Sequence, residues 1–248
     1  MDLDVRTYKT EQKLYDTAAL ALLKKLDTLA RAQQTDLHVG VAGGSIATRL
    51  LPALVGLIEQ KSELTNHWCP IHLWLVDERF VDLDGEDRTD SIIERAFSSK
   101  VPAVTLHRPL RPSEGTLEEA AADYEQQLID QFGGNSAAVK MDLLIMGMGP
   151  DGHIASLFPS HETLDAAGLV TFEDDSPKPP PQRITMTMNL LKRSRFAWFV
   201  IAGKDKAAVL SSVASGGDYR EIPAIALNQV GTLWWCDKAA ASKLTAEL

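Results

Sequence analysis

The chain has 248 residues, of which 45% are hydrophobic and 24% charged, an ordinary balance for a folded globular protein. Its formal net charge of −9 argues against non-specific nucleic-acid binding, but a few local cations can still hold an anionic small molecule. Residues 1–14 lack the apolar core of a signal peptide, and no run of about 20 apolar residues predicts a membrane span. Cys69 and Cys236, the only cysteines, lie in or beside apolar segments, so we expect reduced, buried thiols and a cytoplasmic protein.

Apolar strand-like segments alternate with helix-like segments along the whole chain. The expected strands are short apolar runs at 36–42, 70–76, 104–106, 141–146, 196–202 and 232–236. The expected helices cover 11–32, 46–64, 116–132 and 204–214, with Ser113 or Thr116 as a cap of the third. Strands that are apolar on both faces indicate a parallel sheet covered on both sides. We therefore expect a three-layer, Rossmann-like α/β fold, with residues 1–248 as a single domain and 174–181 (DDSPKPPP) as an extended surface loop.

The most informative stretch is 141–159, which reads MDLLIMGMGPDGHIASLFP. It predicts an apolar strand, a glycine-rich turn, and then His153 at the start of a short helical run. Ligands of open α/β sheets bind beyond the carboxyl ends of the strands, so His153 is placed for proton transfer to a ligand. A helix N-terminus would keep its imidazole neutral, as a general base requires, and Asp151 would cap that helix or orient the ring. The simpler alternative is a structural histidine.

Residues 147–152 also match the G-x-G-x-x-G pattern of dinucleotide-binding turns, with two acidic residues about 20 positions later. Asp151 would place a carboxylate beside the pyrophosphate, and Pro150 removes a backbone N–H that could bind it. An NAD-dependent oxidoreductase is therefore a less favoured alternative, and a tight turn without any ligand is another. No His/Cys spacing indicates a metal site.

A second glycine-rich turn, Gly43-Gly44-Ser45, follows an expected strand and opens an expected helix. Backbone N–H groups at such a place favour an anion, so the turn is a candidate phosphate cradle, although it lacks the Gly-Lys-Ser/Thr of a P-loop. It also comes close to the G-x-S-x-G nucleophile elbow, with Ala47 at the last position. A serine hydrolase using Ser45 and His153 therefore stays open, as does a simple N-cap role for Ser45.

Cationic residues are the remaining candidates. Asp77-Glu78-Arg79 follows an expected strand, on the same sheet edge as Ser45 and His153 if the sheet is parallel. Arg79 would stabilise developing negative charge or hold a phosphate; the simpler interpretation is a solvated charge cluster. Arg183 and Lys206 are ordinary by composition, and gain interest because two cations and a glycine turn together make a phosphate site.

In this order, the segments resemble the 6-phosphogluconolactonase family. The resemblance is most specific at 147–159, and it extends over Gly43-Gly44-Ser45, Asp77-Glu78-Arg79, Arg183-Ile184-Thr185 and the Gly-x-x-Lys of 203–206. The related glucosamine-6-phosphate deaminases share the fold and the Gly-Pro-Asp-Gly-His core, but continue into Phe-Asn-Glu-Pro, which supplies a catalytic carboxylate. This chain has Ser-Leu-Phe-Pro at 156–159, which favours the lactonase. It departs from the family at Ile46-Ala47, where Thr-Pro is usual, and at Thr89, nearest to a usual Asn.

The resemblance implies a glucosamine-6-phosphate deaminase-like fold and hydrolysis of 6-phosphoglucono-δ-lactone to 6-phosphogluconate in the oxidative pentose phosphate pathway. It implies that His153 activates water, that Asp151 orients the ring, and that Arg79 serves the oxyanion or the phosphate. The implied phosphate-binding residues are Gly43, Gly44, Ser45, Arg183 and Lys206. It implies no metal or organic cofactor, and a small sugar-phosphate lactone as the partner of a chain slightly favoured to be a monomer. The alternatives are a serine hydrolase using Ser45 and a non-catalytic sugar-phosphate binding protein.

Overall fold

A seven-stranded sheet forms the centre of the computed structural model, which describes residues 3–32, 35–82, 88–97 and 101–244. Every strand pair in this sheet is parallel, in the order β1-β10-β9-β6-β2-β3-β5. The strands are β1 (Val5–Tyr8), β2 (Leu37–Val41), β3 (Ile71–Leu75), β5 (Val104–His107), β6 (Leu143–Met146), β9 (Ala197–Ile201) and β10 (Thr232–Asp237). The five central strands are buried at every residue, because layers on both faces exclude water. The predicted parallel α/β architecture is confirmed.

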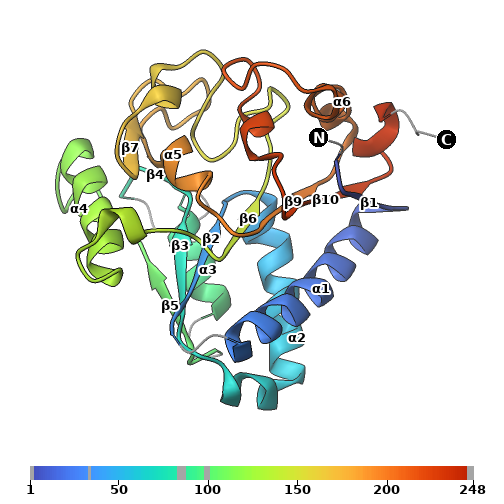
Figure 1. Cartoon of the computed structure of the whole chain (residues 1–248), viewed down its shortest axis with the longest axis horizontal. Helices are drawn as coiled ribbons and strands as arrows, with labels where there is room; N and C mark the ends of the chain where they lie inside the picture. The colour runs from blue at the N-terminus through green and yellow to red at the C-terminus, as the bar shows by residue number, and fades with distance from the viewer. Residues whose placement is uncertain (1–2, 33–34, 83–87, 98–100, 245–248) are drawn as a thin grey trace.

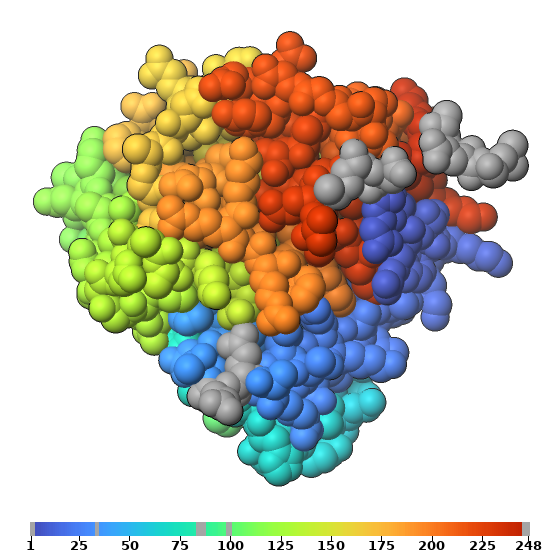
Figure 2. All heavy atoms as spheres, viewed as in Figure 1, coloured from blue at the N-terminus to red at the C-terminus, as the bar shows by residue number. Residues whose placement is uncertain are grey.

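Helices cover both faces of the sheet (Figure 1). On one face lie α1 (Glu11–Ala32), α2 (Leu51–Gln60) and α3 (Thr89–Phe97); on the other lie α4 (Leu117–Gln131), α5 (Met188–Leu191) and α6 (Ala207–Ser215). The α4 helix begins where the sequence indicates, because Thr116 and Glu119 form a reciprocal capping box. Figure 2 shows the same view with all atoms, the N-terminal region in blue below and the C-terminal region in orange and red above.

A second sheet has no counterpart in the sequence-based expectation. It is antiparallel, in the order β4-β8-β7, and consists of β4 (Asp77–Arg79), β8 (Arg183–Met186) and β7 (Val170–Glu173). Only Val76 separates β4 from the end of β3, so the charged segment continues into a strand of this second sheet. In the register of β4 and β8, Arg79 lies directly opposite Arg183. The pairing of strands about 100 residues apart thus brings two predicted site residues together.

The helix expected after His153 is absent. Residues 150–160 form turns with one isolated bridge, Ile154 to Leu157, and the next helical segment is a 3₁₀ turn at Glu162–Asp165. Gly152 and Ala155 have φ values of +84° and +50°, which an α-helix does not accommodate. The helix expected after Ser45 is present, but it starts as a π-helical turn, Ile46–Leu50, before α2. Within the described residues, no helix is long and apolar enough to cross a membrane.

Candidate active site

A cavity of about 430 Å³ opens where the parallel strands β2, β6 and β9 end. Its wall contains nearly all of the residues that the sequence singled out: Gly43, Gly44, Ser45, Arg79, His153, Arg183 and Lys206. Asp151 stands behind this wall, in contact with His153. These residues come from five places in the chain and meet at one sheet edge, the place where open α/β sheets bind ligands.

The His153 ring is held by Asp151. Its Nδ1 lies 2.5 Å from Asp151 Oδ1, and the ring packs against Phe158 with centroids 4.8 Å apart. An ionised carboxylate only accepts hydrogen bonds, so Nδ1 carries the proton and Nε2 remains the nitrogen that can accept one. Burial lowers the pKa of His153, and Asp151 partly opposes that effect. The imidazole is thus kept neutral by desolvation, and not by a helix dipole as the sequence suggested; with no helix present, Asp151 orients the ring and caps nothing.

Gly149 is required by the close approach of this pair. A Cβ atom on Gly149 would lie less than 3.0 Å from the His153 ring and from the Asp151 carboxylate, closer than real Cβ atoms come. Two of the turn's N–H groups are also occupied: Gly149 N donates to His153 O (3.0 Å) and Gly152 N donates to Gly149 O (3.1 Å). This turn therefore holds a histidine, and it lacks the following helix that a dinucleotide site needs.

The Gly43–Ser45 turn faces the cavity from the end of β2. Gly44 has a φ of +58°, and a Cβ on Gly43 would lie 2.6 Å from Thr89 Oγ1. Ser45 stands at the N-cap position of the Ile46–Leu50 turn, but its side chain makes no capping hydrogen bond. Burial raises the pKa of the Tyr15 phenol, and a hydrogen bond with Ser45 partly opposes this. Among the described residues Ser45 makes no hydrogen bond to His153, so the two are not arranged as nucleophile and base.

Four basic side chains line the same cavity: Arg79, Lys178, Arg183 and Lys206. Arg79 lies directly opposite Arg183, where like charges repel, and the carboxylates of Asp77, Glu78 and Glu173 act on Arg183 in the opposite sense. An anion between the two guanidinium groups would relieve their repulsion. Lys206 is paired with Asp205 (Nζ to Oδ2, 2.9 Å). Arg183 donates from Nε to Pro180 O (3.0 Å) and from Nη2 to the carbonyls of Lys178 (3.0 Å) and Pro179 (3.2 Å). Much of the Arg183 guanidinium is therefore bound to backbone, which the sequence did not anticipate.

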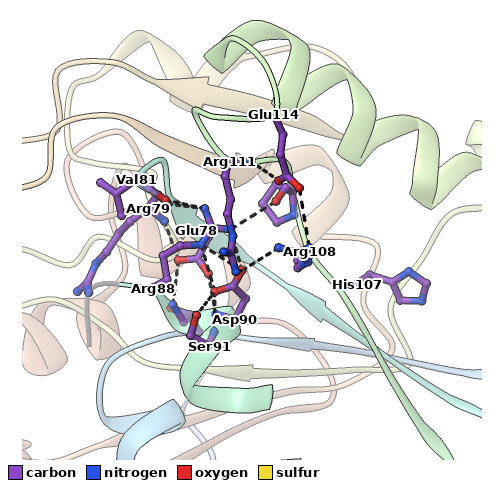
Figure 3. A network of polar contacts seen from close by, with 12 residues as sticks. Glu78, Arg79, Val81, Arg88, Asp90, Ser91, His107, Arg108, Arg111 and Glu114 are labelled. Carbon is purple, nitrogen blue, oxygen red and sulfur yellow. Dashed lines mark hydrogen bonds and ion pairs between the residues drawn. The ribbon is translucent and has the colours of Figure 1, made fainter. Parts of the chain in front are cut away.

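A buried polar network behind β4 supports Arg79 (Figure 3). Glu78 is 1% exposed, and its carboxylate accepts backbone N–H groups of Arg79 (2.8 Å), Thr89 (3.0 Å) and Asp90 (2.7 Å). Burial raises the pKa of Glu78 to about 7, and the nearby charge of Arg88 opposes this. Arg88 is itself paired with Asp90 (2.9 Å). A solvated charge cluster is thus the wrong description of residues 77–79: Glu78 ties β4 to the start of α3.

Lys178 is a site residue that sequence reasoning missed. It stands in the segment 174–181, which was expected to be a surface loop, yet Lys178 and Pro179 line the cavity. Its Nζ lies 3.2 Å from His153 Nδ1 and 3.9 Å from Asp151 Oδ1. The available signal was a single lysine among four prolines, a composition that also suits an exposed loop. No cluster of three or more His, Cys, Asp or Glu in the described part of the chain could hold a metal ion.

The fold and the cavity define an α/β protein in which an Asp–His pair stands at a cavity lined by four basic side chains. The chain belongs to the family described as glucosamine-6-phosphate isomerases/6-phosphogluconolactonase, which it matches over residues 9–235. It is 37% identical to 6-phosphogluconolactonase of Mycobacterium tuberculosis over 223 residues, 87% of each chain. It is 34% identical to the human 6-phosphogluconolactonase over 247 residues, 97% of this chain and 93% of that one. The crystal structure of 6-phosphogluconolactonase from Thermotoga maritima matches with a TM-score of 0.75 and 30% identity, covering 94% of this chain and 99% of the other.

Proposed function

We propose that this protein hydrolyses 6-phosphoglucono-δ-lactone to 6-phosphogluconate, with His153 as the general base. The observation that carries the proposal is the Asp151–His153 pair, 2.5 Å apart, at the wall of a cavity lined by four basic side chains. Curated relatives with the name 6-phosphogluconolactonase, similar over most of the chain, support the choice of substrate. We further propose that residues 1–248 form one domain that acts in the cytoplasm. Cys69 and Cys236 are both free, as thiols are in a reducing compartment.

The proposed reaction needs one base and one water. His153 Nε2 takes a proton from water while the water oxygen bonds to the lactone carbonyl carbon, and the carbonyl oxygen gains negative charge. The bond from that carbon to the ring oxygen then breaks, and the imidazolium returns the proton to the leaving oxygen. Asp151 stabilises the imidazolium between the two steps, in the manner of the carboxylate partner in a catalytic triad. A δ-lactone is an activated ester, so no covalent enzyme intermediate is required.

The substrate's phosphate would occupy the cationic part of the cavity. We assign it to the backbone of Gly43, Gly44 and Ser45 together with Lys206 and the face of Arg183 that the loop carbonyls leave. Arg79, opposite Arg183, is assigned to the phosphate or to the developing oxyanion. Each charge-assisted contact of this kind contributes about 1.5–3 kcal/mol. Binding energy from the phosphate contacts would therefore help to stabilise the transition state at the distant lactone carbonyl.

The test is a turnover assay with freshly generated 6-phosphogluconolactone, corrected for spontaneous hydrolysis. We expect enzyme-dependent acid release that His153→Ala abolishes, and a much lower kcat/KM for unphosphorylated gluconolactone. Glucosamine 6-phosphate serves as the control substrate, because the family also includes deaminases. The deaminase segment Phe-Asn-Glu-Pro is replaced here by Ser-Leu-Phe-Pro at 156–159, so the apolar Phe158, packed against the His153 ring, stands where the deaminases have their carboxylate. Ammonia release without lactone hydrolysis would overturn the proposal.

A further inference from the structure

The ammonium of Lys178 lies beside Nδ1 of His153, the ring nitrogen that cannot accept a hydrogen bond from it. Nδ1 is 2.5 Å from Asp151 and carries its proton toward that carboxylate, so Lys178 Nζ, 3.2 Å away, has no lone pair on Nδ1 to bind. The contact is therefore one of charge: a second cation stands next to the ring whenever the ring is protonated. A like charge at this distance disfavours the imidazolium.

The loop that presents Lys178 is fixed by its backbone. Ser176 Oγ donates to Lys178 O (3.0 Å) and accepts from Lys178 N (3.2 Å). Arg183, from β8, donates to the carbonyls of three successive residues, Lys178, Pro179 and Pro180. A side chain on an ordinary exposed loop would spread over many rotamers and positions. Here the backbone of Lys178 is held at the cavity wall, within reach of the ring, and its Nζ lies 3.2 Å from His153 Nδ1.

The groups around His153 include some that raise its pKa and some that lower it. Asp151 and Asp77 raise its pKa, whereas burial and Lys178 lower it. Burial also lowers the pKa of Lys178, and the charges of Lys206 and Arg183 add to that effect while Asp151 opposes it. The carboxylate that orients the ring would by itself favour the protonated, inactive form. A neighbouring cation lowers the pKa of His153 again while leaving the hydrogen bond to Asp151, and thus the orientation of the ring, in place.

We propose that Lys178 is a positioning residue of this site, whose ammonium, held beside His153 by the Arg183-bound loop, keeps the imidazole unprotonated and ready to take a proton from water. The contact itself is independent of the substrate, and only its use in catalysis rests on the proposed function. Lys178 offsets the effect of Asp151, so that the base works at a lower pH than the Asp151–His153 pair alone would allow.

The test is an NMR titration of the His153 Cε1–H resonance, assigned with His153→Gln, in the full-length protein. In Lys178→Gln we expect the midpoint of the His153 titration to rise by about one pH unit, because the like charge is gone. Lys178→Arg keeps the charge and should leave the midpoint near that of the wild type. Lys204→Gln removes an exposed lysine outside the cavity lining and is the matched control. The Lys178 side chain is 41% exposed, so these variants should fold.

The kinetic arm measures kcat/KM for 6-phosphogluconolactone against pH. The acidic limb reports the base of the free enzyme and should move to higher pH in Lys178→Gln, in step with the NMR midpoint, while Lys178→Arg restores it. An unmoved midpoint in Lys178→Gln would overturn the proposal, as would a rise in KM with an unchanged pH profile, which would make Lys178 a substrate ligand. Absence of lactone turnover in the wild type would refute the proposed function instead, and the NMR result would still decide the role of Lys178.

Discussion

Replacing Gly149 by alanine tests whether the Asp151–His153 geometry carries the activity, without removing either side chain. The added methyl would lie less than 3.0 Å from both the imidazole and the carboxylate, so the ring must move by about 1 Å or more to relieve the overlap. Misplacement of a reacting group by about 1 Å costs on the order of 10²-fold in rate. The residues that we propose to bind the phosphate lie on other segments, so affinity for the product should change little. We therefore expect kcat to fall about 100-fold while the dissociation constant for 6-phosphogluconate stays within about threefold.

The assay is steady-state hydrolysis of the lactone together with calorimetric titration of the product. A thermal melt establishes that the variant is folded. Gly56→Ala is the matched control, because Gly56 lies within α2 and an added Cβ there meets nothing within 4 Å. That variant should keep wild-type turnover and gain about 0.5–1 kcal/mol of stability from helix propensity. Wild-type kcat in a folded Gly149→Ala protein would refute the reasoning, since the pair would then be displaced without consequence.

Four further outcomes are expected. His153→Ala should lower kcat by about 10²–10⁴-fold with a smaller change in KM, whereas Ser45→Ala should weaken substrate binding and keep turnover. Loss of turnover with intact substrate binding in Ser45→Ala would favour a covalent serine mechanism instead. Lys206→Ala should weaken 6-phosphogluconate binding about tenfold or more in calorimetry, and equal affinity would remove Lys206 from the phosphate site. Stability should fall as the pH drops from 6.5 toward about 4, because burial lowers the pKa of His38 and His107 to about 4 and only the unfolded chain is then protonated there. The pKa of Glu78 is raised from 4.5 to about 7, so between these pH values the folded chain binds a proton that the unfolded chain lacks, which increases stability as the pH falls. A Tm that does not decrease between pH 7 and pH 5 would show that the two histidines do not control the pH dependence of stability.

The sequence alone determined six of the seven strands of the described parallel sheet and the helices α1, α2, α4 and α6, but neither the edge strand β1 nor the helix α3. Fully apolar runs such as 196–202 form strands in water-free layers, and the strong helical period of 11–32 needs no tertiary information. Thr116 and Glu119 mark the start of α4, because a capping box is a local interaction. The Gly-Pro-Asp-Gly-His segment likewise identified His153 and Asp151, since two residues in one turn are neighbours in any fold. For these features, local chemistry and short-range pattern were sufficient.

Only the tertiary structure decided how His153 is kept neutral and which cations surround it. The predicted helix after His153 does not form, so burial takes the place of the helix dipole. Arg79 and Arg183 become neighbours through the antiparallel pairing of β4 and β8, strands too short for their pattern to stand out. Lys178 reaches His153 because Arg183 binds the backbone of a loop whose composition indicates only exposure. Such contacts join residues far apart in the chain, and their energy depends on distance and burial, which no local pattern encodes.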